Sequence, residues 1–207
     1  MGEGWSYLSP EKEAFSEFKE RGSKFIGRLS SVESPEDAMR FLEGLRKSYH
    51  DATHHCWAYR TGWKGALRSR SSDDGEPSGT AGAPILASLE KRCVSDACLV
   101  VVRYFGGTKL GTGNLRRAYR ASARLTLEAA SLVKHVLCSD WSIELPWGAQ
   151  GALRHRAGTL GIRLTEESCG ELLVLHAKVP VDSEAPFMSY LENLKSQWKG
   201  AVSWKSS

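Results

Sequence analysis

A glycine-rich run at residues 106–113 is the part of the sequence best suited to binding an anion. Gly106, Gly107, Gly111 and Gly113 follow a strand-like run, and Lys109 lies between them. Glycines let several backbone N–H groups point at one anion, and the start of the next helix adds partial positive charge. The run lacks the GxxxxGK motif followed by Ser or Thr, so a phosphate-loop ATPase is disfavoured.

Cationic side chains continue from this loop into a helix that we expect to begin at Asn114, with Asn114 as its cap. Residues 99–127 include six Lys and Arg residues and no Asp or Glu. Four of the six lie on this helix: Arg116, Arg117, Arg120 and Arg124. Residues four apart share a helix face, so three of these arginines form a stripe that favours an anionic partner. The alternative is an ordinary solvated helix face.

An acidic turn is the second group of residues with chemical potential. Asp73, Asp74 and Glu76 are three carboxylates within four residues, followed by Thr80. Such a set could hold a divalent cation. It could equally shape a turn or cap the next helix, because Asp-Gly and Glu-Pro are turn sequences.

The segment before the acidic turn combines a large ring with cations. Arg60, Trp63 and Lys64 are followed by Arg68 and Arg70, with no acid between them. Loops that bind single-stranded nucleic acid have this composition, because rings stack on bases and cations follow the phosphates. Ordinary loop composition explains it equally well.

Evidence for catalysis is weak. The six histidines form no Ser–His–Asp pattern and no HExxH motif, although His54 or Cys56 could form a site with Asp73 or Glu76. The five cysteines are scattered and form no CxxC pair, which indicates reduced thiols in the cytosol. We expect no metal and no cofactor. Enzymatic activity stays open, with a binding protein favoured.

Length and composition indicate a globular protein. The chain has 207 residues, of which 41% are hydrophobic and 25% charged. Its net charge of +4 is concentrated in residues 54–120, which carry 11 Lys and Arg against five Asp and Glu. No apolar run approaches the ~18 residues of a membrane span, and residues 1–12 lack a signal core. We therefore expect a cytoplasmic location.

Periodicity and turn residues predict the elements that position these groups. We expect strands at residues 15–20, 24–32, 53–60 and 99–105, a long loop at 61–79, and helices at 34–49, 80–91 and 114–130. Ser34 should cap the first of these helices, with Pro35 at its first position. On the strand at 53–60, His54 and Cys56 should share one face.

A second domain is expected to begin at Cys138. Residues 138–207 predict a strand, a helix, two strands, a helix and a strand. That order is the βαββαβ pattern of ferredoxin-like domains. We thus expect two domains, at residues 1–137 and 138–207, in an α+β protein.

Three motifs in this order resemble the YigZ/Impact family. They are Ala52–Arg60, Asp73–Gly82 and Val102–Gly111, with Arg117–Tyr119 continuing the third. Asn114 departs from the family pattern, since it stands where the family usually has glycine. Asn tolerates unusual backbone angles, so the loop should survive.

The resemblance implies a fold for each domain. The N-terminal domain should be a left-handed βαβ sandwich similar to a small-subunit ribosomal protein and to the fourth domain of elongation factor G. The C-terminal domain should be ferredoxin-like, similar to the last domain of that factor. Eukaryotic relatives carry an extra N-terminal domain and restrain a starvation-activated kinase. Here the first motif begins near residue 52, so we do not carry that role over.

The leading hypothesis is a nucleic-acid-binding accessory protein of translation that engages RNA or the ribosome. The expected contact residues are Arg60, Trp63, Lys64, Arg103, Lys109, Arg116, Arg117 and Arg120. A second hypothesis is an enzyme or binder of a small phosphorylated ligand in a pocket between the acidic turn and the glycine loop. That pocket would be lined by His54, Cys56, Asp73, Asp74, Glu76, Thr80, Gly106, Gly107 and Tyr119. A third is a protein-interaction module that meets an acidic protein. From its place among apolar residues, Arg103 is expected to point toward the acidic turn.

Overall fold

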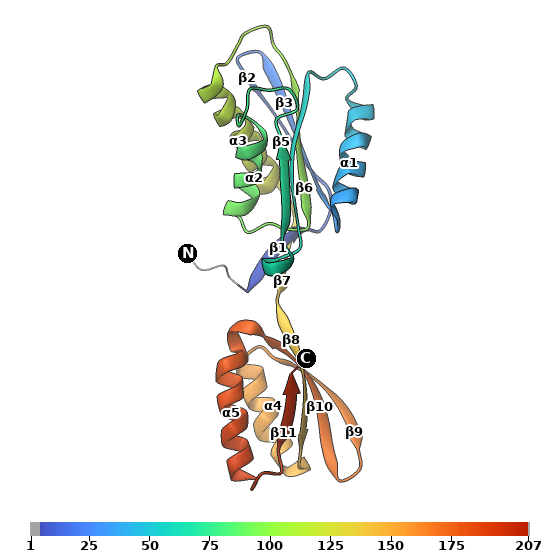
Figure 1. Cartoon of the computed structure of the whole chain (residues 1–207), viewed down its shortest axis with the longest axis vertical. Coiled ribbons are helices and arrows are strands. Elements are labelled where there is room, and N and C mark those ends of the chain that lie inside the picture. The colour runs from blue at the N-terminus through green and yellow to red at the C-terminus, as the bar shows by residue number, and fades with distance from the viewer. Residues whose placement is uncertain (1–4, 207) are drawn as a thin grey trace. The chain divides into compact units, whose positions relative to one another are not determined.

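The computed structural model describes residues 5–206, without the side chains of Lys64 and residues 167–169. The chain divides into two compact units, one spanning residues 7–135 and the other beginning at residue 136. Trp5 and Ser6 group with the second unit. The division lies within three residues of the boundary expected at Cys138 (Figure 1).

The first unit is built on a five-stranded antiparallel sheet of order β2-β3-β6-β4-β5. Its strands are β2 (Ala14–Glu20), β3 (Ser23–Ser31), β4 (His54–Thr61), β5 (Arg68–Ser72) and β6 (Ala97–Tyr104). Helix α1 (Pro35–Ser48) covers one face, and α2 (Gly82–Lys91) and α3 (Thr112–Ala129) cover the other (Figure 1). A one-turn helix η1 (Lys64–Ala66) precedes β5, and β1 (Ser6–Pro10) pairs with β7 (Leu132–Val136).

Central strands of this sheet are buried on both faces. On β4, Cys56 and Ala58 pack toward α2 and α3, whereas Trp57 and Tyr59 pack toward α1. This confirms the alternation expected for the strand. Because helices cover both faces, one apolar core lies on each side of the sheet. Close packing of these two cores holds the residues of β4 and β6 in fixed positions.

Helix α1 begins as its sequence predicts. Ser34 is the N-cap, and its hydroxyl accepts a hydrogen bond of 3.1 Å from the backbone N–H of Asp37. Pro35 follows at the first helical position. Glu36 and Asp37 lie in the first turn, where the helix dipole favours negative charge.

The expectation of a continuous loop at residues 61–79 was wrong. Strand β5 lies within it and pairs with β4, with Tyr59 opposite Arg70. The segment RSRSS has no apolar residue and therefore no alternation of apolar and polar side chains, so nothing in its sequence indicates a strand. It is an edge strand held by backbone hydrogen bonds, and charged side chains at such an edge oppose pairing with other chains.

The second unit has the βαββαβ order that the sequence predicted. Its elements are β8 (Cys138–Leu145), η2 (Trp147–Ala149), α4 (Gln150–Thr159), β9 (Arg163–Cys169), β10 (Leu172–Pro180), η3 (Val181–Ser183), α5 (Glu184–Gln197) and β11 (Ser203–Ser206). The antiparallel sheet has the order β11-β8-β10-β9. Helices α4 and α5 cover one face of it and leave the other face open (Figure 1).

A separate apolar core holds the second unit together. Its fully buried members include Ile143, Leu153, Leu175 and Phe187, and none of them belongs to the cores of the first unit. With its own sheet in each unit, the fold is α+β, as expected. Among the described residues, no helix has both the length and the apolar character to cross a membrane.

Because the cores are separate, we expect the two units to unfold independently. Leu153→Ala should destabilise the second unit by about 2–5 kcal/mol, as cavity-forming core substitutions do. Hydrogen–deuterium exchange measured by mass spectrometry should show faster exchange in β8 and β10 and unchanged exchange in β3 and β6. Leu99→Ala, at an equally buried site in the first unit, should give the reverse pattern. Equal loss of protection in both units would show one cooperative domain.

Candidate functional site

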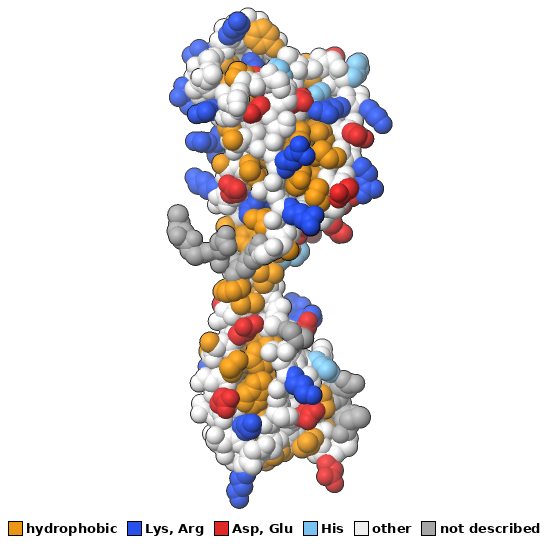
Figure 2. Space-filling view, in the orientation of Figure 1, with side chains coloured by type: hydrophobic (Ala, Val, Ile, Leu, Met, Phe, Trp, Pro, Cys, Tyr) orange, Lys and Arg blue, Asp and Glu red, His pale blue; other side chains and the backbone are white. Residues whose placement is uncertain are grey.

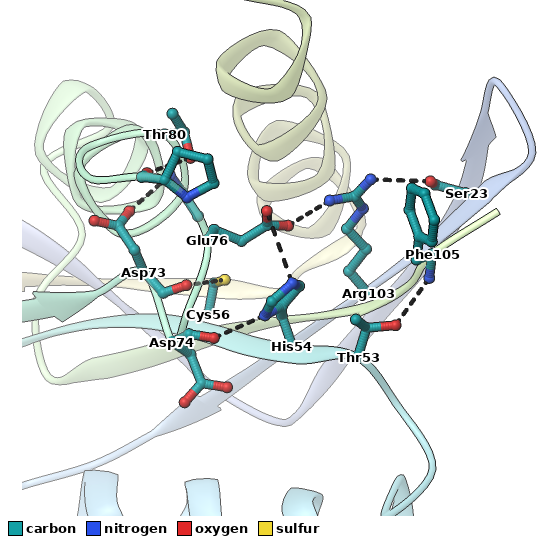
Figure 3. Close-up of polar contacts among 12 residues, drawn as sticks. Ser23, Thr53, His54, Cys56, Asp73, Asp74, Glu76, Thr80, Arg103 and Phe105 are labelled. Carbon is teal, nitrogen blue, oxygen red and sulfur yellow. Dashed lines mark hydrogen bonds and ion pairs between the residues drawn. The ribbon is translucent and has the colours of Figure 1, made fainter. Parts of the chain in front are cut away.

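A buried carboxylate lies where the sequence motifs meet. The Glu76 side chain is 4% exposed and accepts hydrogen bonds from Arg103 Nη1 at 2.6 Å and from the Tyr119 hydroxyl at 2.7 Å. Arg103, on β6, also donates to the Ser23 hydroxyl at 3.1 Å (Figure 3). The expectation that Arg103 points toward the acidic turn is confirmed, with Glu76 as its partner.

His54 closes the Glu76 network on the β4 side. Its Nδ1 lies 2.8 Å from the Asp74 carbonyl oxygen, and its Nε2 lies 3.8 Å from Glu76 Oε2 (Figure 3). A carbonyl oxygen only accepts, so Nδ1 carries the hydrogen in this contact. The imidazole therefore bridges the backbone of the acidic turn and its buried carboxylate.

Cys56 is a buried structural thiol. Its sulfur lies 2.9 Å from the Asp73 carbonyl oxygen and 3.3 Å from the Tyr119 hydroxyl. Burial raises the pKa of the Cys56 thiol, and burial beside Cys56 and Glu76 raises the pKa of Tyr119. Both groups stay protonated at neutral pH. Cys56 is thus no thiolate nucleophile, and Tyr119 remains a donor to Glu76.

The remaining carboxylates of the acidic turn hold the backbone. Asp73 accepts from the N–H groups of Gly79, Ala81 and Gly82 at 2.7–2.9 Å. Burial works to raise the pKa of Asp73, but these backbone hydrogen bonds lower it below its usual value. Ala81 and Gly82 stand at the start of α2, so Asp73 caps this helix from outside it.

Asp74 and Thr80 complete the turn. Asp74 accepts from Arg46 of α1 at 2.7 Å and from the backbone N–H of His55 at 2.7 Å. The buried Thr80 hydroxyl donates to the Pro77 carbonyl oxygen. Among residues 5–206, no group of three or more His, Cys, Asp and Glu is arranged to hold a metal ion.

The glycine loop is packed against the tip of the β2–β3 hairpin. A Cβ atom on Gly106 would lie 2.0 Å from the carbonyl carbon of Gly22, so only glycine fits there. The Gly106 N–H donates to the Ser23 hydroxyl, which also binds Arg103. Gly107 has a φ of +84°, a conformation that L side chains rarely adopt. Gly106 is therefore a packing position, whereas Lys109 in the same loop is exposed.

Asn114 does not cap α3, contrary to the expectation. The helix begins earlier, with Gly111 as its N-cap, and the Asn114 side-chain amide donates to the Leu110 carbonyl oxygen at 2.8 Å. Gly111 carries no side chain, so no side-chain hydrogen bond caps the start of α3. Asn114 instead ties the first turn of α3 to the loop, and Arg117 binds its side-chain oxygen.

Two of the expected nucleic-acid contacts lie inside the fold. Arg60 is 7% exposed and donates to the Val94 carbonyl oxygen. Its guanidinium lies 5.4 Å from the centre of the Trp63 ring, and that ring stacks on Tyr7 at 5.2 Å. Arg103 is equally buried. The side chain of Lys64 lies outside the described part of the chain.

The exposed arginines of α3 lie beside cations of α2. Arg116 Nε donates to the Gly79 carbonyl oxygen at 3.1 Å, which joins α3 to the acidic turn. Farther along the helix, Arg120 and Arg124 line a groove of about 410 Å³. Its other lining residues are Ala87, Ser88, Lys91, Arg92, Leu127 and Glu128. Figure 2 shows Lys and Arg side chains along this edge of the first unit.

Sequence analysis missed Lys91 and Arg92, which form the α2 side of this α2–α3 groove. The sequence held a signal for this side of the groove. Lys91 lies four residues after Ala87, and Arg92 four after Ser88, so these residues lie along one side of the helix. The signal was weak because two adjacent cations at a helix end are commonly explained by the helix dipole alone.

Breaking the pair at Glu76 should unfold the first unit more easily. Arg103→Ala leaves a buried carboxylate unpaired, so it should lower the free energy of unfolding by about 3–5 kcal/mol in denaturant titrations. Adding Glu76→Gln removes the stranded charge and should recover part of that loss. Arg117→Ala, an exposed control, should change stability by no more than ~0.5 kcal/mol. An Arg103→Ala protein as stable as this control would contradict the network.

Thiol reactivity should separate the buried from the exposed cysteines. Burial raises the pKa of Cys98 to about 12 and raises that of Cys56, so both thiols stay protonated at pH 8. Cys93 and Cys138 are exposed. Iodoacetamide at pH 8 should therefore label Cys93 and Cys138 and spare the other two until denaturant is added, as peptide mass spectrometry can show. Rapid native labelling of Cys56 would indicate an accessible, reactive thiol.

Comparison with known proteins places the chain in a family. A model described as the Impact N-terminal domain matches residues 21–127, which include the whole Glu76 network. IMPACT family member YvyE of Bacillus subtilis is 42% identical over 132 residues, or 64% of this chain and 60% of that protein. IMPACT family member YigZ of Escherichia coli is 31% identical over 170 residues, or 82% of this chain and 83% of that protein.

A solved structure matches nearly the whole chain. The crystal structure of a hypothetical protein matches it with a TM-score of 0.60 and 28% identity, over 96% of both chains. The chain thus shares the fold of that protein. It belongs to the Impact family.

Proposed function

We propose that this protein binds the sugar–phosphate backbone of RNA through the α2–α3 groove and acts as an accessory protein of translation. The observation that carries the proposal is the composition of this groove. Lys91, Arg92, Arg120 and Arg124 line it, and Glu128 is its one carboxylate. A groove with this balance of charge attracts phosphate groups.

Three of the four cations are available to a ligand. Arg124 Nη1 binds both oxygens of Glu128, at 2.8 and 2.9 Å. Among the described residues, no ion pair joins Lys91, Arg92 or Arg120 to a carboxylate. These three exposed cations can therefore neutralise phosphates without first breaking an ion pair of the protein.

The length of the cationic surface favours a polymer over a small anion. Arg116 and Arg117 precede the groove residues on α3, and Lys109 lies in the loop before that helix. All three are exposed. A chain of phosphates could contact both the groove and this stretch of helix, whereas a single phosphate would use only one of them.

The choice of RNA and of translation rests on the likeness to two adjacent domains of an elongation factor that the family resemblance implies, which is an analogy. The alternative of a phosphorylated ligand between the acidic turn and the glycine loop gains no support from the geometry. There Arg103 and Glu76 form an ion pair with each other, and the carboxylates of Asp73 and Asp74 accept hydrogen bonds from backbone N–H groups. An acidic protein could meet the same cations, and competition with RNA would reveal it.

Affinity for single-stranded RNA should depend steeply on salt. Each phosphate of a single strand adds about 0.7 to the slope of log K against log salt, so three groove contacts predict a slope near −2 or steeper. Fluorescence anisotropy with a labelled 12-nucleotide oligouridylate measures it. In the Lys91→Gln, Arg120→Gln variant the slope should become shallower by about 1.4.

A matched control removes the same charge elsewhere in the first unit. Lys19 on β2 and Lys47 on α1 are both exposed, and neither lines the groove. Lys19→Gln, Lys47→Gln should leave the slope close to that of the unmodified protein. An equal decrease of the salt slope in the two variants would show that binding depends only on the net charge of the protein. A flat salt dependence of the unmodified protein would contradict RNA binding altogether.

A further inference from the structure

The open face of the sheet in the second unit carries a shallow, cation-lined hollow of about 650 Å³. No motif of the sequence indicated it, because its residues come from four separate strands. The lining side chains include Asp140, Ser142, Arg163, Thr165, His176, Lys178 and Lys205. It lies outside residues 21–127, the part matched by the family model.

Strand register arranges these residues in two rows across the sheet. In the first row Lys205 of β11 is opposite Ser142 of β8, which is opposite His176 of β10. His176 in turn is opposite Thr165 of β9. Because opposed residues point to the same face, the row presents an ammonium, two hydroxyls and an imidazole over a width of about 14 Å.

The second row is more strongly charged. Asp140 of β8 is opposite Lys178 of β10, which is opposite Arg163 of β9. Lys178 Nζ lies 3.1 Å from Asp140 Oδ1, and both side chains are 66% exposed. An exposed pair of this kind is weak, so Lys178 can exchange its partner for a phosphate. Glu144, two residues beyond Ser142, marks the acidic end of the face.

Charge and chemistry on this face select an anion. Among the residues that line the hollow, Arg163, Lys178 and Lys205 outnumber the carboxylate of Asp140. Among the described residues, no ion pair engages Arg163 or Lys205. The hydroxyls of Ser142 and Thr165 also line the hollow and are donors suited to phosphate oxygens, once Thr165 gives up its long 3.4 Å hydrogen bond to the His176 carbonyl oxygen.

Bases, in contrast, find no exposed Phe, Tyr or Trp ring among the described residues that line the hollow, where the exposed ring is the imidazole of His176. Sheets that bind RNA bases do so with exposed aromatic side chains. The one Trp that borders this hollow, Trp141, is 3% exposed and belongs to the core. A ligand would therefore be held by its phosphates, whatever its sequence.

We propose that this sheet platform, defined by Arg163, Lys178, Lys205, His176, Ser142 and Thr165, is a second binding site for the RNA backbone and recognises phosphates without regard to base. The identity of the polyanion rests on the proposed function. The site itself rests on the second unit alone.

The platform is tested in the full chain with the variant Arg163→Gln, Lys205→Gln. Anisotropy with labelled 12-nucleotide oligouridylate and oligoadenylate should show a salt slope shallower by about 1.4 for both oligomers. The matched control is Arg154→Gln, Lys195→Gln, which removes two charges from α4 and α5 on the covered side of the same sheet. That control should keep the slope of the unmodified protein. Unlabelled inorganic polyphosphate should compete for the platform, since it offers phosphates without bases.

The groove variant Lys91→Gln, Arg120→Gln, measured in parallel, separates this proposal from the proposed function. An unchanged slope in the platform variant, with a shallower slope in the groove variant, overturns the platform and leaves the proposed function standing. A shallower slope in the platform variant alone supports the platform and overturns the groove. Unchanged slopes in both variants overturn both sites. A platform variant that weakens binding to only one of the two oligomers overturns base-independent recognition.

Discussion

The burial of one carboxylate, that of Glu76, constrains much of the first unit. A buried carboxylate must be paired and hydrogen-bonded, or it costs several kcal/mol. Arg103 of β6 and Tyr119 of α3 meet this need, and Ser23 of β3 in turn binds Arg103. One side chain of the acidic turn thus fixes the positions of a central strand, a helix and a hairpin tip.

The pair of Arg103 and Glu76 fixes the position of the acidic turn more than it adds to the free energy of unfolding. Buried ion pairs often contribute little net free energy, yet removing one partner is strongly destabilising. The pair therefore penalises any structure in which the acidic turn leaves its place. Because Asp73 of the same turn caps the start of α2, the turn sets α2 against α3, and the groove between these helices follows. The acidic turn therefore supports the cationic surface formed by α2 and α3.

Much of the fold could be predicted from the sequence because local signals agree with it. The cap at Ser34, the alternation on β4 and the βαββαβ order all survive in the structure. Strand β5 could not be predicted, since all its residues are polar and it joins the sheet through backbone pairing with β4. Arg60 shows why the binding residues could not all be predicted. The sequence identifies it as a cation, but its burial depends on tertiary packing. The sheet platform could not be predicted either, because its residues lie on four strands that only the folded sheet brings together.

The central claim is that the groove between α2 and α3 is the surface of the first unit that meets RNA. Backbone amide chemical shifts of the ¹⁵N-labelled full chain, followed during titration with oligouridylate, test it most directly. The account predicts that, within the first unit, the largest shift changes cluster at residues 87–92 and 116–128, with little change in α1 on the opposite face of the sheet. Changes concentrated at α1 or at the acidic turn, or none in the groove at saturating RNA, would contradict it.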